Sequence, residues 1–402
     1  MKILVLEHLF PLPADSGGKI KSYYAIRALA REHELRVLSY IRGEDERRAV
    51  PELRRICPDL DIVPLKRSRL NQIADGVAGL AYGRSFIVSR DFRREMRDAF
   101  RRSVDEFAPD VVHIDHLQMA QFVDFSSAYK TVLDNHNVES MIIKRIAETS
   151  SSRVMRSYAR LEWPKLLKYE TEVCRKCDLV LTVSEEDKAT LQQLEPSISN
   201  VRSVPIGIDT DPGRMVTRDP KSHDILFLGT MHWPPNIDCV LYFHRDILPL
   251  VREAIPDCTF TIAGQRPAPS VAALAHDPAV RVTGYVTDTK VPAAKCGVFV
   301  VPLRSGSGVR VKILDALAMG LPVVSTSIGA EGLDVKHGEH LLIADTPQDF
   351  ARAVADVLSD PALAEKLVRS GRELVEAKYS WQVAGDALLS IYAERFGQAE
   401  SV

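Results

Sequence analysis

The sequence of 402 residues lacks any apolar run near the ~18 consecutive residues that a membrane span needs. Its first residues, Met1–Glu7, hold an apolar core far shorter than that of a secretory signal, and this core ends at the acid Glu7. The net charge is only −2, which argues against a surface suited as a whole to nucleic acid. We therefore expect a globular cytoplasmic protein that binds no nucleic acid.

Cysteine is scarce, and the sequence has no zinc pattern. Cys174 and Cys177 form one C-x-x-C pair without a second pair at zinc spacing, so we interpret the pair as incidental on a helix face. A dinucleotide fingerprint is also missing, because the nearest match, Gly306-x-Gly308, has Val311 where a third glycine is required. These absences exclude the simplest metal, redox and dinucleotide functions.

The sequence does contain two successive runs of short apolar segments that alternate with helix-like segments. Such continuous apolar segments are typical of parallel strands that are covered on both faces. The predicted strands are 3–6, 35–40, 111–114, 131–134 and 179–183, then 225–228, 259–263, 280–283, 298–301, 322–325 and 341–343. We predict two doubly wound α/β domains, 1–205 and 206–380, and a last helix within 381–402 that packs back on the first domain.

Two glycine-rich stretches follow predicted strands. Gly17 and Gly18 precede a helix expected at about 20–31, where they could bind an anion or form an ordinary turn. Further on, a second helix is expected, with Ser307 as its N-cap. Arg310 and Lys312 would then lie in its first turn, where each cation is unfavourable by about 0.3–1 kcal/mol. A bound phosphate would reverse that penalty, so we favour phosphate contact over extension of both side chains into solvent.

That second stretch resembles the donor segment of glycosyltransferase family 4. Asp315-Ala-Leu-Ala-Met-Gly-Leu-Pro-Val-Val324 matches the family helix E-A-M-A-x-G-x-P-V-V. Eight further motifs occur in the family's order: 13–18, 109–116, 178–184, 204–209, 225–229, 262–264, 282–286 and 379–381. The resemblance implies the GT-B fold, in which two Rossmann-like domains face a central cleft, and sugar transfer with retention of anomeric configuration.

The resemblance also implies a donor site in the second domain, with two departures. The family's Glu-x7-Glu positions hold Ser307 and Asp315, so the ribose contact remains while the sugar-side acid is lost. The loop after 225–228 lacks the family's Arg and Lys, and we infer that Arg310 and Lys312 replace them. The other residues assigned to the donor are Gly17, Gly18, Gly306, Ser307 and Gly308 at the diphosphate, Gly284, Tyr285 and Val286 near the base, and Gly229 and Asn236 elsewhere in the cleft.

The catalytic group that the resemblance implies has three candidates. The second histidine of the family motif D-V-V-H-x-H aligns with Asp115, beside His116, and His136 ends a neighbouring predicted strand. We rank His116 first, Asp115 second and His136 third, and expect His113 to be buried. Family members generally need no metal, so two Asp-x-Asp pairs, at 59/61 and 209/211, are interpreted as chance matches.

The sequence therefore predicts a retaining, metal-independent, hexosyltransferase-like enzyme without a cofactor. It would move sugar from a UDP- or GDP-sugar to a saccharide or lipid-linked acceptor in the assembly of a bacterial surface polysaccharide. A GT-B-fold sugar-nucleotide 2-epimerase and a non-catalytic nucleotide-sugar binder remain alternatives. The segment 66–102 has ten basic and four acidic residues, so it is either a solvated face or a peripheral contact with the anionic inner face of the cell membrane.

Overall fold

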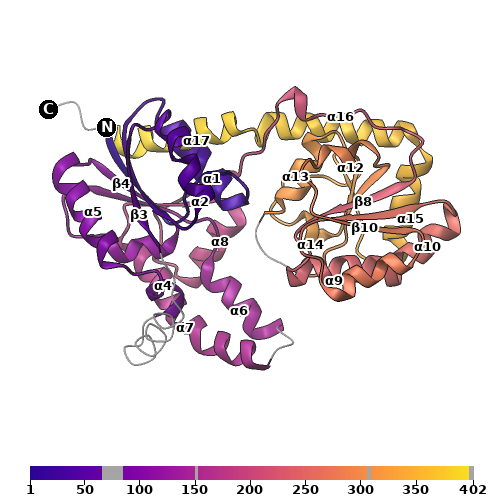
Figure 1. Cartoon of the computed structure of the whole chain (residues 1–402), viewed down its shortest axis with the longest axis horizontal. Coiled ribbons are helices and arrows are strands. Elements are labelled where there is room, and N and C mark those ends of the chain that lie inside the picture. Colours follow the sequence, from indigo (N-terminus) through magenta and orange to yellow (C-terminus); the bar gives the residue numbers. More distant parts are fainter. Residues whose placement is uncertain (66–84, 150–152, 306–308, 398–402) are drawn as a thin grey trace. The chain divides into compact units, whose positions relative to one another are not determined.

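The computed structural model describes residues 1–65, 85–149, 153–305 and 309–397 (Figure 1). Contacts divide the chain into two compact units, which we describe separately. Unit 1 comprises Met1–Pro205 with Ala384–Val402, and unit 2 comprises Ile206–Val383. Helices lie on both faces of each sheet (Figure 1). No helix among the described residues is long and apolar enough to cross a membrane.

Unit 1 is built on a seven-stranded, wholly parallel sheet with the order β3-β2-β1-β4-β5-β6-β7. Its strands are β1 (Lys2–Glu7), β2 (Glu34–Ile41), β3 (Asp59–Pro64), β4 (Val111–Asp115), β5 (Lys130–Asp134), β6 (Leu179–Thr182) and β7 (Val201–Ser203). Its helices are α1 (Gly17–Leu29), α2 (Glu44–Arg54), α4 (Phe86–Ser89), α5 (Arg94–Phe107), η1 (Leu117–Phe122), α6 (Glu139–Thr149), α7 (Arg153–Lys176) and α8 (Glu185–Leu194). The strand order reverses between β1 and β4, which is where open α/β sheets bind ligands.

The central strand β1 shows why this sheet is covered on both faces. Ile3 and Val5 belong to one hydrophobic cluster, whereas Leu4 and Leu6 belong to another. Successive side chains of a strand point to opposite faces, so the continuous apolar run requires two apolar layers. Helix α17 (Trp381–Phe396) contributes to the cluster of Ile3 and Val5 through Leu388, Leu389 and Tyr392.

Unit 2 repeats this plan with a six-stranded parallel sheet in the order β10-β9-β8-β11-β12-β13. Its strands are β8 (Asp224–Leu228), β9 (Thr259–Ala263), β10 (Val280–Gly284), β11 (Val298–Val301), β12 (Val323–Ser325) and β13 (Leu342–Ile343). Its helices are η2 (Pro212–Arg214), α9 (Pro234–Tyr242), η3 (Phe243–Ile247), α10 (Leu248–Ala254), α11 (Pro269–Ala272), η4 (Ala273–His276), α12 (Lys290–Ala294), α13 (Val311–Ala318), α14 (Ser327–Ala330), α15 (Pro347–Ser359) and α16 (Pro361–Lys378). The switch point of unit 2 lies between β8 and β11.

The predicted fold class is confirmed, and all the predicted strands are present, but two helix starts were wrong. Helix α1 begins at Gly17 rather than near 20, so the glycine pair forms the first helical turn instead of a loop before it. Helix α13 begins at Val311 with Arg310 in the N-cap position, although the sequence predicted Ser307 there. Lys312 still lies in the first turn of α13.

The basic segment 66–102 is only partly described, because 66–84 lie outside the described residues. In the remainder, Ile87, Val88 and Phe100 are buried in the core of unit 1. These side chains are unavailable to a lipid surface. The cysteines of the C-x-x-C pair are buried thiols, and burial raises the pKa of Cys177 to about 12.

Candidate active site

Three acids end neighbouring strands at the carboxyl edge of the sheet in unit 1. Glu7 of β1 is in register with Asp115 of β4, which is in register with Asp134 of β5. All three side chains are buried. Burying charge is unfavourable unless it is paired, so these acids require partners close by.

Asp115 finds its partners in two histidines and a serine. His116 Nδ1 donates to Asp115 Oδ2 over 2.5 Å, and His136 Nε2 donates to Asp115 Oδ1 over 2.7 Å. Ser22 Oγ, from α1, donates to Oδ1 over 3.1 Å. The two imidazole rings lie 3.9 Å apart between centroids. Asp115 thus fixes both rings, and the three catalytic candidates from the sequence form one cluster.

The pKa values of the two histidines are shifted in opposite directions. Burial disfavours an imidazolium, but Asp115 overrides this at His116 and raises the pKa of His116 above its usual value. At His136 burial dominates, with His116 and Lys21 adding to it, and the pKa of His136 falls to about 4. Burial alone would raise the pKa of Asp115, yet the two histidines hold it well below its usual value. One histidine is therefore readily charged and its neighbour is neutral, a split typical of paired acid–base groups.

The first turn of α1 lies against this histidine pair. A Cβ added at Gly18 would be 3.6 Å from both His116 Nε2 and His136 Nδ1, the ring nitrogens that do not bond to Asp115. The free nitrogen of His116 therefore faces the helix N-terminus, where backbone N–H groups favour an anion. This arrangement can bind a negatively charged oxygen or donate a proton to one.

Further buried polar side chains surround the cluster, and among them the sequence analysis predicted only the burial of His113, which is confirmed. Lys21 of α1 pairs with Asp134, and His113 Nδ1 lies 2.7 Å from the hydroxyl of Tyr392 on α17. Burial, together with Asp115, raises the pKa of Glu7 well above its usual value. Lys21 and Asp134 carry one detectable sequence signal, since each lies at or near a strand end or in the first turns of a helix.

A second Asp–His pair lies beside the cluster. His8 Nε2 donates to Asp91 Oδ2 over 3.0 Å, and the ring of His8 is 5.6 Å from that of His116. Burial lowers the pKa of His8 to about 4. The position of His8 directly after β1 is the signal that could have found it.

The same cluster has the ligand spacing of a metal site. The ligand atoms of Asp115, His116 and His136 lie within 4.8 Å of one another, and imidazole and carboxylate suit a divalent transition metal. These atoms already satisfy each other through hydrogen bonds, and Lys21 adds a positive charge nearby. The sequence-matched metal pairs are engaged elsewhere: Asp59 pairs with Arg36 at 2.7 Å, and Asp211 caps η2 through the amide of Gly213.

In unit 2, the switch point brings Lys312 of α13 to the loop after β8. Lys312 Nζ donates to Asn236 Oδ1 over 2.9 Å and lies 4.2 Å from the ring centre of Phe227. Asn236 in turn donates to the carbonyl of Thr230 over 3.0 Å. A Cβ at Gly229 would lie 3.0 Å from Lys312 Nζ, so glycine is what allows this approach.

Lys312 is a cation without an acidic partner among the described residues. Burial and neighbouring Arg310 lower its pKa to about 8. Arg310, at the N-cap position of α13, is itself buried. Two adjacent cations at a helix N-terminus repel each other and the helix dipole, and a bound dianion relieves both effects.

Asp315, the predicted ribose contact, lies one turn further along α13. Arg214 of η2 pairs with its Oδ1. Burial raises the pKa of Asp315, while Arg214 opposes that shift. No motif pointed to Arg214, which is distant from Asp315 in the chain and follows the Asp209/Asp211 loop.

The predicted base region lies at the end of β10. Gly284 has a φ of +70°, Tyr285 is exposed, and Val286 packs partly against the core of unit 2. Two strand spacings, roughly 10 Å, separate β10 from β8, so a ligand extended along the sheet edge would reach both regions. The predicted residues Gly306, Ser307 and Gly308 lie outside the described residues.

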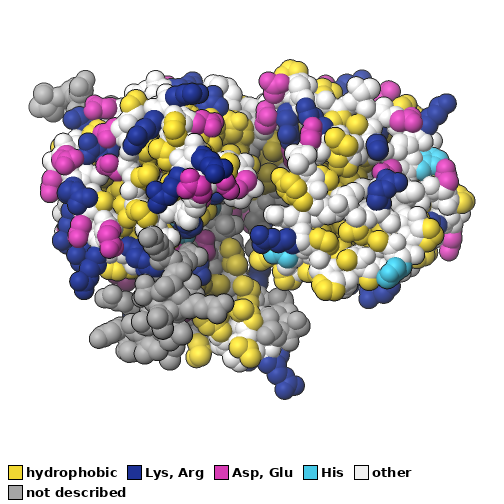
Figure 2. Space-filling model, in the orientation of Figure 1, with side chains coloured by type: hydrophobic (Ala, Val, Ile, Leu, Met, Phe, Trp, Pro, Cys, Tyr) yellow, Lys and Arg dark blue, Asp and Glu magenta, His cyan; other side chains and the backbone are white. Residues whose placement is uncertain are grey.

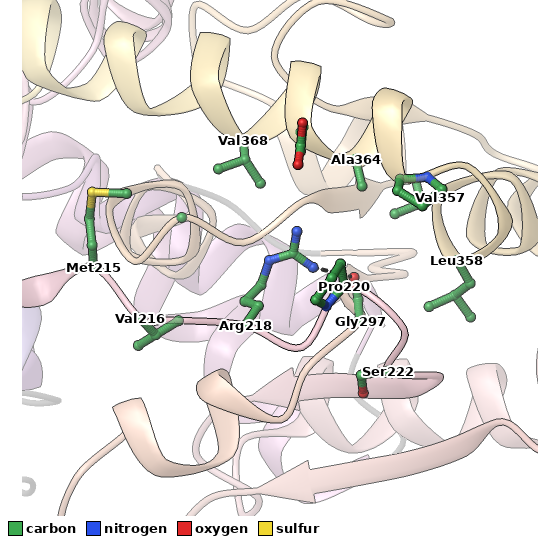
Figure 3. Close-up of a pocket in the computed structure, with 13 residues that line it drawn as sticks. Met215, Val216, Arg218, Pro220, Ser222, Gly297, Val357, Leu358, Ala364 and Val368 are labelled. Atoms are coloured by element: carbon green, nitrogen blue, oxygen red, sulfur yellow. Dashed lines mark hydrogen bonds between the residues drawn. The ribbon is translucent and has the colours of Figure 1, made fainter.

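A cavity of about 200 Å³ lies at the opposite edge of the same sheet (Figure 3). Ser222 and Gly297 precede β8 and β11, so this cavity is at the amino ends of the strands. Arg218 reaches across it to the carbonyl of Gly297, 3.3 Å away (Figure 3). Ligands of doubly wound folds bind at the carboxyl ends, so this cavity is separate from the donor site predicted for unit 2.

Two parallel, doubly wound units in one chain are the arrangement found in the GT-B class of glycosyltransferases. Residues 22–212 match the family model "Glycosyltransferase Family 4", and residues 222–360 match "Glycosyl transferases group 1". These two matches together cover most of the chain. The chain therefore belongs to the glycosyltransferases of family 4 and group 1.

Individual proteins support the same assignment. An uncharacterized 44.6 kDa protein in the cps region of Klebsiella pneumoniae is 24% identical over 367 residues, 88% of this chain and 90% of that protein. The sucrose-phosphate synthase structure from Thermosynechococcus elongatus has a TM-score of 0.70 at 16% identity, over 99% of this chain and all of that one. Anabaena HepE in complex with UDP has a TM-score of 0.67 at 12% identity, over 98% of this chain and all of HepE. At these identities the structural likeness shows the fold.

Proposed function

We propose that the protein transfers a sugar from a UDP- or GDP-sugar to a saccharide or lipid-linked acceptor, with retention of anomeric configuration and without a metal. One observation carries the proposal: Lys312 and Arg310 meet at the switch point of unit 2, and Lys312 has no carboxylate partner among the described residues. The UDP complex of HepE and the place of the Klebsiella relative in a cps region support the donor class and a role in polysaccharide assembly.

The proposed mechanism assigns the leaving diphosphate to unit 2. Arg310, Lys312 and the amides at the start of α13 stabilise the charge that develops on the diphosphate as the glycosidic bond breaks. Asp315 holds the ribose, and the loop after β10 contacts the base. Preorganised cations in a half-buried site make this stabilisation larger than it would be in water.

The polar group that acts in the reaction is assigned to unit 1. His116 is held as a charged donor by Asp115, and its Nε2 faces Gly18. Asp115 and His136 are positioning residues in this account, because they act through His116. Retention is what the family resemblance implies.

Metal independence gives the first prediction. Side-chain cations take the place of a metal at the diphosphate, so donor turnover is expected to be unchanged by EDTA. Turnover would be measured as release of UDP or GDP after dialysis against the chelator. Loss of turnover that Mg²⁺, Mn²⁺ or Zn²⁺ restores would show that an acidic pair or the Asp115 cluster holds a required ion.

The lowered pKa of Lys312 gives the second prediction. Its free-state pKa is about 8, and a bound diphosphate would raise it, so binding requires proton uptake once the pH exceeds 8. Diphosphate affinity should therefore be constant between pH 7 and 7.5 and fall by up to about tenfold per pH unit above 8. Calorimetric titration from pH 7 to 9.5 measures this slope.

The matched control is Lys312→Arg, which remains charged throughout this range. Its affinity should show no comparable slope, whatever its absolute value. An equal slope in Lys312→Arg and the parent would assign the titration to another group and remove Lys312 from the diphosphate.

A further inference from the structure

The first half of α7 carries an exposed apolar ridge. Four exposed large apolar side chains occur within eight residues of this helix: Val154, Met155, Tyr158 and Leu161. Val154 is 82% exposed and Leu161 is 68% exposed. Val154, Tyr158 and Leu161 have i, i+4, i+7 spacing, so they line up along one side of the helix. Apolar side chains are normally scattered singly on a surface, so an exposed stripe on one helix requires an explanation.

A basic ridge follows the other flank of the exposed side of the helix, roughly 135° around from the apolar ridge at 100° per residue. Arg153, Arg156 and Arg160 have i, i+3, i+7 spacing, and no Asp or Glu occurs between 153 and 161. The next acid, Glu162, is buried and accepts hydrogen bonds from Ser85 Oγ at 2.5 Å and from the amide of Ile87. The exposed side of this helix is thus apolar and positively charged.

The other side of the helix packs against unit 1. Ala159 and Leu166 are buried on the opposite side of α7, and α6 packs along it. Figure 2 shows apolar side chains exposed on the lower part of unit 1, where Figure 1 places α6 and α7. Helices that lie in the plane of a membrane surface typically combine an apolar side with basic residues, as the exposed side of α7 does.

We propose that residues 153–161 of α7 dock the protein on a membrane surface rich in anionic lipid. The apolar ridge would enter the boundary between headgroups and acyl chains, and the three arginines would pair with lipid phosphates. The inference that this surface contacts lipid depends on the residues of α7 alone. The further inference that the contact serves to reach a lipid-linked acceptor rests on the proposed function. The surface differs from the segment 66–102, whose described apolar residues are largely buried.

The test is flotation of the full chain with vesicles of phosphatidylcholine, with and without phosphatidylglycerol. Each cation near an anionic surface strengthens partitioning by about fivefold, so three arginines predict a preference on the order of 100-fold for anionic vesicles. The preference should decrease at 1 M salt, where the Debye length is about 3 Å. Equal binding to both vesicle types overturns the proposal.

A matched pair of variants locates the surface. Val154→Glu places an acid in the ridge, and Val291→Glu makes the same change at an exposed valine of unit 2, 61% exposed. Val154→Glu should weaken anionic-vesicle binding at least tenfold, whereas Val291→Glu should leave it unchanged, with equal melting temperatures for both. Equal loss in the two variants, or no loss in Val154→Glu, overturns the proposal. If the parent does not bind vesicles but forms a dimer, and Val154→Glu dissociates that dimer, the ridge is an interface with a second copy of the chain instead.

Donor turnover in detergent separates this result from the proposed function. Val154→Glu should release UDP or GDP from the donor at the parent's rate. A parent without turnover that binds anionic vesicles would contradict the proposed function and leave the docking surface intact.

Discussion

Replacement of His116 by glutamine is expected to lower kcat by about 10²- to 10⁴-fold, the contribution typical of a group that moves or donates a proton. Glutamine can still donate a hydrogen bond to Asp115 but cannot carry charge. Asp115 raises the pKa of His116, so the imidazolium and the activity that depends on it persist above the usual histidine range and are lost at higher pH. Donor turnover against pH, in parent and variant, measures both effects.

His136→Gln is the matched control for this prediction. His136 also bonds to Asp115, but it is neutral at physiological pH because its pKa is about 4. Its replacement should reduce kcat by less than tenfold and leave the pH profile in place. If His136→Gln is as damaging as His116→Gln, or if the parent's pH profile survives in His116→Gln, the charged group is not His116.

Replacement of Arg310 by alanine is expected to weaken binding of the nucleoside diphosphate by about 1.5–3 kcal/mol, the range for hydrogen bonds to charged groups. The nucleoside without phosphate should bind equally to variant and parent. Removing Arg310 also removes a charge that lowers the pKa of Lys312, so the alkaline decrease in affinity should begin at a higher pH. Calorimetry with the nucleoside, its monophosphate and its diphosphate measures all three effects.

Two controls define what Arg310 does. Arg304 is a nearby arginine that pairs with Asp238 at 3.1 Å, so Arg304→Ala should leave diphosphate affinity nearly unchanged. Asp315→Ala should weaken nucleoside and nucleotide alike, since the ribose is present in both. Equal losses for nucleoside and diphosphate in Arg310→Ala would contradict its assignment to the phosphates.

Much of the fold could be predicted from the sequence, because buried parallel strands consist of continuous apolar runs. The run Val111–Ile114 predicted β4 almost to the residue. The strands β3 and β7 are additional to the prediction for identifiable reasons. In β3 only Leu60 and Val63 are buried, and exposed or half-buried residues separate them, so this edge strand has no continuous apolar run. β7 has only three residues, too few for a periodic signal.

The candidate site could be predicted only where residues lie next to a strand end or share a motif. Asp115 and His116 carried both signals, and Lys312 was found because it follows a glycine-rich loop. Lys21 lies in the first turns of a helix but belongs to no motif, and Arg214 carried neither signal. Each acts through a partner more than 100 residues away, Asp134 and Asp315 respectively, and a single sequence does not show such pairings. The start of α1 was also predicted wrongly. Gly17 and Gly18 were interpreted as a loop, although glycine is compatible with the first turn of a helix.

The central claim is that the chain is an active glycosyltransferase that uses a nucleotide diphosphate sugar. Incubation of the purified protein with a panel of UDP- and GDP-sugars, followed by analysis of the nucleotides and sugars formed, tests it most directly. The account predicts slow release of UDP or GDP and free sugar from one donor in water, lost in His116→Gln and retained in EDTA. Recovery of an isomerised donor would indicate a 2-epimerase, and binding of a donor without any turnover would indicate a non-catalytic binder; either result would contradict the account.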